Sequence, residues 1–309
     1  MTSEIDDREL PPLPEAPVPV WPGELVELGG RTLFVRRAAH PGAEPAVFVH
    51  GLGGASTNWT DLMYLLRDRY DCWAPDLPGF GRSDPPPAGD YSLDSHVRAV
   101  VRMLEHVVDE AGGPVHLFGN SLGGAVSTRL AATRPDLVRT LTLISPALPV
   151  LRPRRGTDPR LLLLMLPGVS RMVTRAARNQ SAQQRVQEVI ELCYADPAPV
   201  PSDRIAEAVE ELERRRGLPW FDTALMASLR GLARSYCVPR SRSLWTEAAT
   251  VTAPTLLIWG GHDQLVSVSI APRAQSAFRG SRLVVLHDSG HVAQMEHPVR
   301  VAREFLALV

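Results

Sequence analysis

The chain has 309 residues, of which 44% are apolar and 22% charged, and its net charge at pH 7 is −1. This length suits one large α/β domain with an insertion, or two domains, and the composition excludes a disordered or fibrous protein. Non-specific binding of nucleic acid is also excluded as a function, because it requires a basic surface that displaces counterions from phosphates.

The first 22 residues are predicted to form an extended tail. Six prolines between Pro11 and Pro22 favour polyproline character over a folded element. The segment "MTSEIDDREL" is acidic and lacks the basic and apolar regions of a signal peptide. The longest apolar run, Leu161–Val169, is far shorter than the roughly 20 residues that a membrane span needs, so we expect no stable membrane insertion.

Cysteine usage gives a prediction of the compartment. Cys72, Cys193 and Cys237 are odd in number and widely spaced, which suggests neither a disulfide framework nor a zinc site. We therefore expect buried free thiols in a reduced, cytoplasmic protein. The oligomeric state is left open by the sequence.

Short apolar runs predict the strands. Alternating residues on both sides of Gly29 and Gly30 predict a hairpin, because these glycines supply the positive φ angles of a tight turn. Six further runs are almost entirely apolar, which is typical of strands buried on both faces of a parallel sheet. They are Ala46–His50, Cys72–Leu77, Val115–Gly119, Arg139–Ser145, Pro254–Gly260 and Arg282–His287.

Helical patterns separate these runs. The clearest extends from Ser92 to Gly113, with apolar residues three and four positions apart and two glycines at its end. Strands that alternate with helices predict a doubly wound α/β sheet. Residues 151–250 contain helical stretches, Ser181–Ala195 and Ser202–Gly217 among them, but no convincing buried strand. We expect a helical lid there, inserted between core segments 23–150 and 251–309 over the edge where such sheets bind ligands.

A candidate nucleophile lies at one strand-to-helix junction. Gly119-Asn120-Ser121-Leu122-Gly123 fits G-x-S-x-G, with an apolar run before it and a helical pattern after it. In that context the serine occupies a sharp, strained turn that exposes its hydroxyl. The alternative is the glycine-rich turn of a dinucleotide-binding fold, but its G-x-G-x-x-G motif is absent near the first buried run. We predict that Ser121 is the nucleophile.

A serine hydroxyl needs an imidazole to take its proton and a carboxylate to orient that imidazole. Asp263 follows the fifth buried run and His291 lies in a glycine-flanked loop after the sixth. The order Ser121, Asp263, His291 is the chain order expected when each residue stands at the carboxyl end of its own strand. We predict that these three residues form a catalytic triad.

Other residues near the triad are predicted to be structural. His287 is expected inside its strand, His297 at the start of the last helix, and His262 outside the reaction. Asp288 is too near His291 in sequence to approach the far side of the imidazole. His291 and His297 are six residues apart, not the four that place two ligands on one helical face, so we predict no metal and no cofactor.

The tetrahedral intermediate of acyl transfer needs two main-chain N–H donors for its oxyanion. The residue after the nucleophile, Leu122, is predicted to supply one. The loop His50–Gly54, "HGLGG", is predicted to supply the other from Leu52, with Gly53 as the alternative. His50 is expected to anchor this loop.

At this point the sequence resembles the α/β-hydrolase superfamily. Five stretches carry the resemblance, in order: "HGLGG", "DLPGFGRSD", "GNSLGG", "WGGHD" and "SGHVAQMEHP". They extend from about residue 23 to the C-terminus. The resemblance implies a mostly parallel twisted sheet with helices on both faces, with residues 150–250 as the variable lid.

Within the superfamily, the chain resembles small esterases, monoacylglycerol lipases and the carbon–carbon bond hydrolases of meta-cleavage pathways. Asn120 matches the carbon–carbon hydrolases, but these usually have Trp where this chain has Val292, and Pro after the position of Gly53. Both Asn120 and Val292 are candidates for the substrate pocket. We predict cleavage of a small hydrophobic carboxylic ester, with carbon–carbon bond hydrolysis as the alternative and non-catalytic ligand binding as a remote one. The run Leu161–Val173 is interpreted as lid packing; the alternatives are an acyl-chain pocket or contact with lipid.

Overall fold

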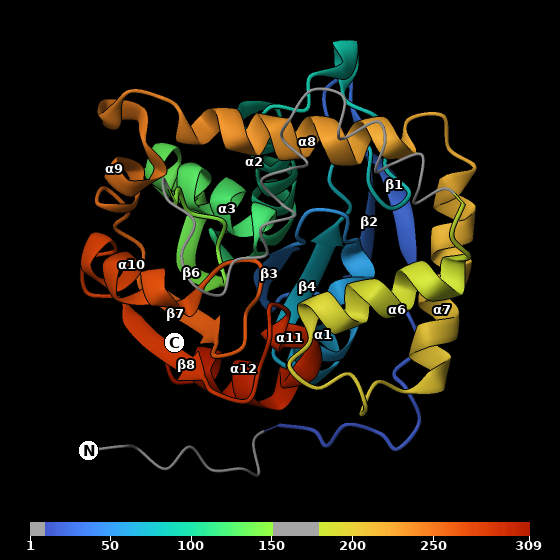
Figure 1. Cartoon of the computed structure of the whole chain (residues 1–309). Helices are drawn as coiled ribbons and strands as arrows, with labels where there is room; N and C mark the ends of the chain where they lie inside the picture. Colours follow the sequence, from blue (N-terminus) through green and yellow to red (C-terminus); the bar gives the residue numbers. More distant parts are fainter. Residues whose placement is uncertain (1–9, 151–178) are drawn as a thin grey trace.

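The computed structural model describes residues 10–150 and 179–309, and these form one eight-stranded sheet covered by helices (Figure 1). The strand order is β1-β2-β4-β3-β5-β6-β7-β8. The strands are β1 (Gly23–Glu27), β2 (Thr32–Ala38), β3 (Glu44–Val49), β4 (Tyr70–Pro75), β5 (Val115–Asn120), β6 (Val138–Ile144), β7 (Thr255–Gly260) and β8 (Arg282–Leu286).

The predicted hairpin and the six predicted strands are confirmed. β1 pairs antiparallel with β2, and Gly29 and Gly30 have φ angles of 60° and 83° in the connecting turn. β2 also pairs antiparallel with β4, whereas all pairs from β4 onward across the sheet are parallel. The expectation of burial on both faces is wrong for β8, which is exposed or half-buried over most of its length. β8 is an edge strand, so it has one neighbour in the sheet and less cover.

The predicted alternation of strands and helices is also confirmed. The helices of the described residues, apart from short 3₁₀ turns, are α1 (Thr60–Leu66), α2 (Leu93–Ala111), α3 (Leu122–Thr133), α6 (Ala182–Cys193), α7 (Ser202–Arg216), α8 (Phe221–Tyr236), α9 (Leu244–Ala248), α10 (Ala271–Ala277), α11 (Ala293–Glu296) and α12 (Pro298–Leu306). α2 begins after Ser92, whose hydroxyl accepts the Ser95 N–H, and ends at Gly112 in the left-handed conformation.

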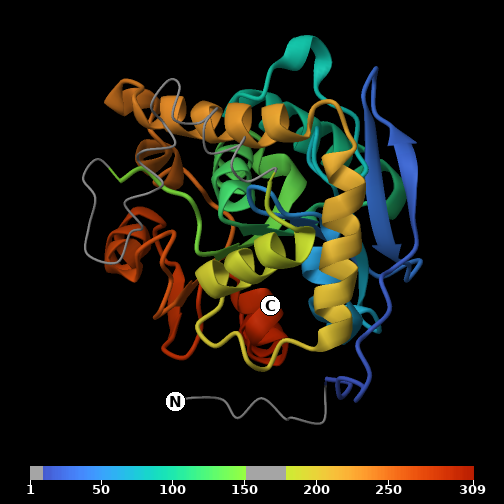
Figure 2. The same ribbon diagram turned by 45° about the vertical axis from the view of Figure 1, so that its right-hand side comes forward.

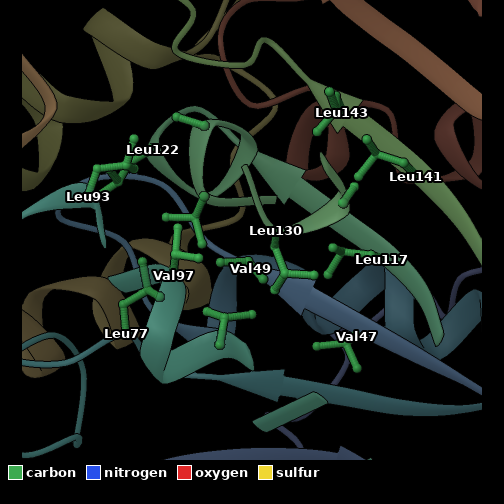
Figure 3. Close-up of a cluster of buried hydrophobic side chains, with 14 of the residues drawn as sticks. Val47, Val49, Leu77, Leu93, Val97, Leu117, Leu122, Leu130, Leu141 and Leu143 are labelled. Carbon is green, nitrogen blue, oxygen red and sulfur yellow. The ribbon is translucent and has the colours of Figure 1, made fainter. Parts of the chain in front are cut away.

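Successive residues of the central strands enter two separate cores. Val47 and Val49 of β3 pack with α2, α3, α9 and α10 on one face of the sheet (Figure 3). Ala46 and Phe48 of the same strand pack with α1, α11 and α12 on the other face. Because side chains alternate across a strand, a nearly continuous apolar run supplies both cores at once.

Residues 179–250 form helices joined by loops and contain no strand, in agreement with the helical stretches expected there. α6 and α7 share a small apolar cluster around Val186, Ile190 and Leu212. Arg204 of α7 bonds Asp61 of α1, with 2.6 Å between nitrogen and oxygen. α8 contacts α2, where Nε2 of His96 lies 3.0 Å from the Ser228 hydroxyl (Figures 1 and 2). The predicted apolar stretch at residues 161–173 lies outside the described residues.

Two sequence expectations concern the surface of the molecule. Residues 10–22 contain neither helix nor strand, and the indole nitrogen of Trp21 donates to the main-chain oxygen of Thr60 at 3.1 Å. The three cysteines are free thiols, but only Cys72 is buried; Cys193 is half-buried and Cys237 is exposed. The expectation of burial is therefore wrong for Cys237, which follows the last turn of α8 at the surface.

Candidate active site

Ser121 occupies a strained turn between β5 and α3. Its φ and ψ angles are 53° and −115°, a backbone conformation that residues other than glycine rarely adopt. The turn is held at both ends, because the Ser121 N–H donates to Ile144 and its carbonyl accepts from Ala125 and Ala147. The strained strand-to-helix turn predicted from G-x-S-x-G is confirmed.

The flanking glycines allow this turn. A Cβ atom on Gly123 would lie 2.1 Å from the main-chain oxygen of Val49, and one on Gly119 would lie 2.6 Å from the oxygen of Gly123. Both contacts are with main chain, which cannot move aside as a flexible side chain can. Strand β5, helix α3 and the end of β3 therefore approach one another at a distance that only glycine permits.

Asp263 and His291 form a buried pair. Oδ2 of Asp263 lies 2.9 Å from Nδ1 of His291, and both side chains are at most 5% exposed. Oδ1 of Asp263 accepts from the N–H groups of Leu265 and Val266, each at 2.8 Å. The carboxylate can only accept at Nδ1, so Nδ1 of the neutral imidazole carries the proton and Nε2 keeps its lone pair. This is the tautomer that a general base requires.

The main chain of His291 is also fixed. Its N–H donates to the carbonyl of Cys193 at the end of α6, with 2.6 Å between the atoms. Its carbonyl accepts from Nδ2 of Asn120 at 3.1 Å. Asn120 directly precedes Ser121 and is 3% exposed. Three separate elements thus hold His291, and one of them is the turn of the predicted nucleophile.

The topology brings the three predicted triad residues to one edge of the sheet. β5, β6, β7 and β8 are neighbouring parallel strands, so their carboxyl ends coincide. Ser121 follows β5, Asp263 follows β7 and His291 follows β8. Open α/β sheets bind ligands at this edge.

The loop His50–Gly54 lies beside the turn of Ser121. A Cβ atom on Gly51 would be 3.1 Å from Cβ of Ser121. The Leu77 N–H donates to Nε2 of His50 at 2.9 Å, so the His50 proton sits on Nδ1 and is donated to the Gly51 oxygen at 2.7 Å. Burial lowers the pKa of His50, which keeps this ring neutral. The predicted anchoring of the loop by His50 is confirmed.

The predicted oxyanion donors are placed on this loop and on α3. Leu52 is half-buried and follows Gly51, while Leu122 is fully buried at the first position of α3. Gly53, the predicted alternative donor, has a φ of 75°. In the part of the chain that the structure describes, the N–H groups of Leu52 and Leu122 are paired with no protein acceptor.

The chain was compared with models of known protein families. The family model of the alpha/beta hydrolase fold matches residues 45–298, which is more than half of the chain. The chain belongs to the α/β-hydrolase family. The fold that the sequence resemblance implied is confirmed, and membership supports a hydrolase.

Individual relatives of this α/β-hydrolase have different activities. The chain is 31% identical over 281 residues to the dihydrolipoyllysine-residue acetyltransferase component of the acetoin cleaving system of Cupriavidus necator, covering 91% of this chain and 66% of that protein. It therefore spans slightly less than two thirds of that relative. It is 26% identical to the 2-hydroxy-6-oxononadienedioate/2-hydroxy-6-oxononatrienedioate hydrolase of Klebsiella pneumoniae, covering 88% of this chain and 89% of that one.

Solved structures share the fold. The 2-hydroxy-6-oxo-6-phenylhexa-2,4-dienoate hydrolase from Rhodococcus sp. strain RHA1 superposes with a TM-score of 0.73 at 22% identity, covering 93% of this chain and 99% of that one. At this identity the match supports the architecture, whereas substrates of the α/β-hydrolase family have to be argued from the site.

The other histidines and the aspartate near the predicted triad lie outside it. His262 and His287 are exposed, and His287 comes one residue after β8 ends, so the expectation that it lies within the strand is wrong. His297 precedes α12 as predicted, and its Nε2 lies 3.1 Å from the carbonyl of Asp288. Asp288 pairs with Arg300 at 2.6 Å instead of approaching His291. In residues 10–150 and 179–309, no cluster of three or more metal-ligating side chains is found.

The substrate-pocket candidates are both largely covered. Both interactions of the Asn120 amide nitrogen are with main-chain carbonyls, those of Ile144 and His291. Val292 is 9% exposed and directly precedes the short helix α11. Their contact with a substrate stays a prediction. Among the helices that the structure describes, none is long and apolar enough to span a membrane.

Two polar residues that the sequence analysis overlooked also contact the loops of the site. Nη1 of Arg215, in α7, donates to the carbonyl of Gly53 at 2.9 Å. The carboxylate of Glu296, in α11, accepts from the N–H of Gly290 at 2.6 Å. Arg215 lies in a run of three arginines that is typical of a solvated surface. Glu296 lies inside "SGHVAQMEHP", where residue type points to the histidines and to Val292 instead.

Proposed function

We propose that this α/β-hydrolase is a serine hydrolase that cleaves a carboxylic ester through an acyl-enzyme. The observation that carries the proposal is the buried Asp263–His291 pair, in which one carboxylate oxygen is held by two main-chain N–H groups and the other by Nδ1. Nε2 of His291 is then free to act as a base. The strained turn of Ser121 at the same edge of the sheet supplies the hydroxyl for that base.

The proposed reaction has two halves. Ser121 Oγ attacks the ester carbonyl while Nε2 of His291 takes the hydroxyl proton, and Asp263 stabilises the imidazolium. The N–H groups of Leu52 and Leu122 stabilise the oxyanion of the tetrahedral intermediate. The imidazolium gives its proton to the leaving alkoxide, and the alcohol departs. A water molecule, deprotonated by His291, then attacks the acyl-enzyme and releases the acid and the free serine.

The proposed substrate is a small hydrophobic ester, and the proposed chemistry uses neither a metal nor another cofactor. We further propose that residues 151–250 act as a lid on a core formed by 23–150 and 251–309. Support comes from Arg215, which joins α7 to the Gly53 carbonyl, and from Cys193, which joins α6 to the His291 N–H. Both contacts support the proposal, because they join α6 and α7 to the proposed catalytic loops.

Hydrolysis of a carbon–carbon bond is the second candidate function. The relative from Klebsiella pneumoniae carries the name of such a hydrolase, and Asn120 matches that class of enzymes. Val292, where those enzymes usually carry Trp, favours the ester. A protein that binds a ligand without reaction is a third and remote candidate.

Substrate turnover separates the three candidates. The purified protein is assayed with nitrophenyl esters of increasing acyl length and with a vinylogous diketone, beside Ser121→Ala and His291→Ala. We expect ester hydrolysis that both substitutions reduce by about three orders of magnitude or more. Cleavage of the diketone without ester turnover would establish the second candidate instead. Turnover of neither, with binding of a hydrophobic ester analogue, would favour the ligand-binding protein.

A further inference from the structure

The chain after α6 lies directly on the loop of His291. The Cys193 carbonyl, the last of α6, accepts the His291 N–H at 2.6 Å. A Cβ atom on Gly290 would lie 2.3 Å from that carbonyl oxygen and 2.8 Å from the Ala195 nitrogen. Residues 193–195 therefore cross the loop at a distance that only glycine at position 290 permits.

The carboxylate of Glu296 joins these two segments. Oε2 accepts from the Gly290 N–H at 2.6 Å and from the Ser289 hydroxyl at 3.0 Å. Oε1 accepts from the Ala195 N–H at 2.7 Å. All three donors are N–H or O–H groups, and a hydrogen bond to a carboxylate is stronger than one between two neutral groups. One side chain thus holds the loop of His291 on one side and the segment after α6 on the other.

The position of Glu296 in the chain gives this arrangement its effect. Glu296 is the last residue of α11, a helix of one turn that begins two residues after His291. The carboxylate therefore closes a small ring of chain that contains His291, and it fixes that ring against α6. The reaction proposed above gives Glu296 no contact with substrate.

We propose that Glu296 is a positioning residue for His291. Through Glu296, the imidazole of His291 is correctly oriented only when α6 is packed against its loop. The inference rests on the proposed function. A residue that only stabilised the fold would affect stability and leave the orientation of His291 unchanged. A positioning residue affects kcat in a protein that remains folded, because a small displacement of a catalytic group slows the chemical step.

Glu296→Gln tests the proposal, since it keeps the size of the side chain but turns one acceptor into a donor that faces N–H groups. We expect kcat for a nitrophenyl ester to fall about 10- to 100-fold while KM changes less than about 3-fold. We also expect faster amide hydrogen exchange in both contacted segments, 287–292 and 193–196. Asp288→Asn is the matched control: it removes a charge from the same loop at a side chain that is 64% exposed and paired with Arg300.

Wild-type kcat in a folded Glu296→Gln protein would overturn the proposal, as would a loss of melting temperature with unchanged kcat. If Glu296→Gln does not fold, Ser289→Ala decides, because it removes one of the three donors and leaves the carboxylate in place. We expect about a 2- to 5-fold loss of kcat there at unchanged KM, and full activity would contradict the proposal. Hydrogen exchange is independent of turnover. Suppose that Glu296→Gln speeds exchange in both segments but the wild-type protein hydrolyses no ester. The positioning contact would then stand, and only the proposed function would be refuted.

Discussion

The amide nitrogen of Asn120 donates to the main-chain carbonyl of His291 at 3.1 Å. It donates to the carbonyl of Ile144 at the same distance. Asn120 precedes the predicted nucleophile, so one buried side chain joins the turn of Ser121 to the loop of His291. The sequence analysis associated Asn120 with carbon–carbon hydrolases and the substrate pocket. The geometry gives it a structural task that either reaction would need.

Asn120→Asp is expected to be more harmful than Asn120→Ala. The aspartate would place a buried carboxylate against two carbonyl oxygens, whereas alanine only removes the two hydrogen bonds. We expect kcat to fall about 100-fold or more in Asn120→Asp and about 10-fold in Asn120→Ala. Steady-state kinetics with circular dichroism as the folding control measures this. Equal activity of the two variants would argue against the bond to His291.

Asp263→Asn is expected to trap the wrong tautomer of His291. The amide oxygen can keep the two bonds from Leu265 and Val266, so the amide nitrogen faces Nδ1 and donates to it. The His291 proton then moves to Nε2, which can no longer accept from Ser121. We expect kcat to fall about 10³- to 10⁴-fold with little change in melting temperature. A loss below about 10-fold would show that another carboxylate orients His291.

Gly123→Ala is expected to destabilise the fold. The added methyl group would stand 2.1 Å from the Val49 oxygen, which belongs to a central strand and cannot move aside. We expect a loss of about 1–3 kcal/mol or more in the free energy of unfolding by urea. Gly113→Ala is the matched control, because the nearest atom to its new Cβ, on Arg139, lies 3.6 Å away. Equal stability of the two variants would contradict the close approach of α3 to β3.

Buried histidines are expected to make the protein less stable in acid. Burial lowers the pKa of His96 from 6.5 to about 4, and its Nε2 lies 3.0 Å from the Ser228 hydroxyl of α8. Between these two pH values the unfolded state binds a proton that the folded state does not, so stability falls as pH falls. The slope from this residue is at most about 1.4 kcal/mol per pH unit.

His96→Gln is expected to flatten the dependence of unfolding free energy on pH between 6.5 and about 4. His50 and His116 act in the same direction, because burial lowers their pKa values too, so part of the slope should persist. His106→Gln serves as the control, since that ring is 40% exposed. An unchanged slope in His96→Gln would mean that His96 is protonated in the folded protein.

Most of the fold could be predicted because each strand is recognisable from the composition of its own short segment. Runs such as Val115–Gly119 and Pro254–Gly260 are apolar at almost every position, and a strand covered on both faces needs this composition. β8 has an equally apolar sequence but lies at the edge of the sheet. Position in a sheet depends on pairing between distant segments, so no local pattern distinguishes an edge strand from a central one.

The candidate site was predictable where residue type and strand order define the chemistry. Ser121, Asp263 and His291 each follow a strand, and parallel neighbours bring such positions together. The supporting contacts of Arg215, Cys193 and Glu296 were missed for a physical reason. They join the helices of residues 179–250 to loops far away in the chain. Arg and Glu side chains are equally common on an exposed surface, and Cys193 bonds through its main-chain carbonyl, which every residue has.

Covalent labelling tests the central claim most directly. The protein is treated with a fluorophosphonate, and the modified residue is located by peptide mass spectrometry, with Ser121→Ala, His291→Ala and Asp263→Asn treated alongside. We predict one adduct, on Ser121, which is absent from Ser121→Ala and forms more slowly by about two orders of magnitude or more in the other two variants. No adduct in the wild type, or an adduct on another residue, would contradict the account.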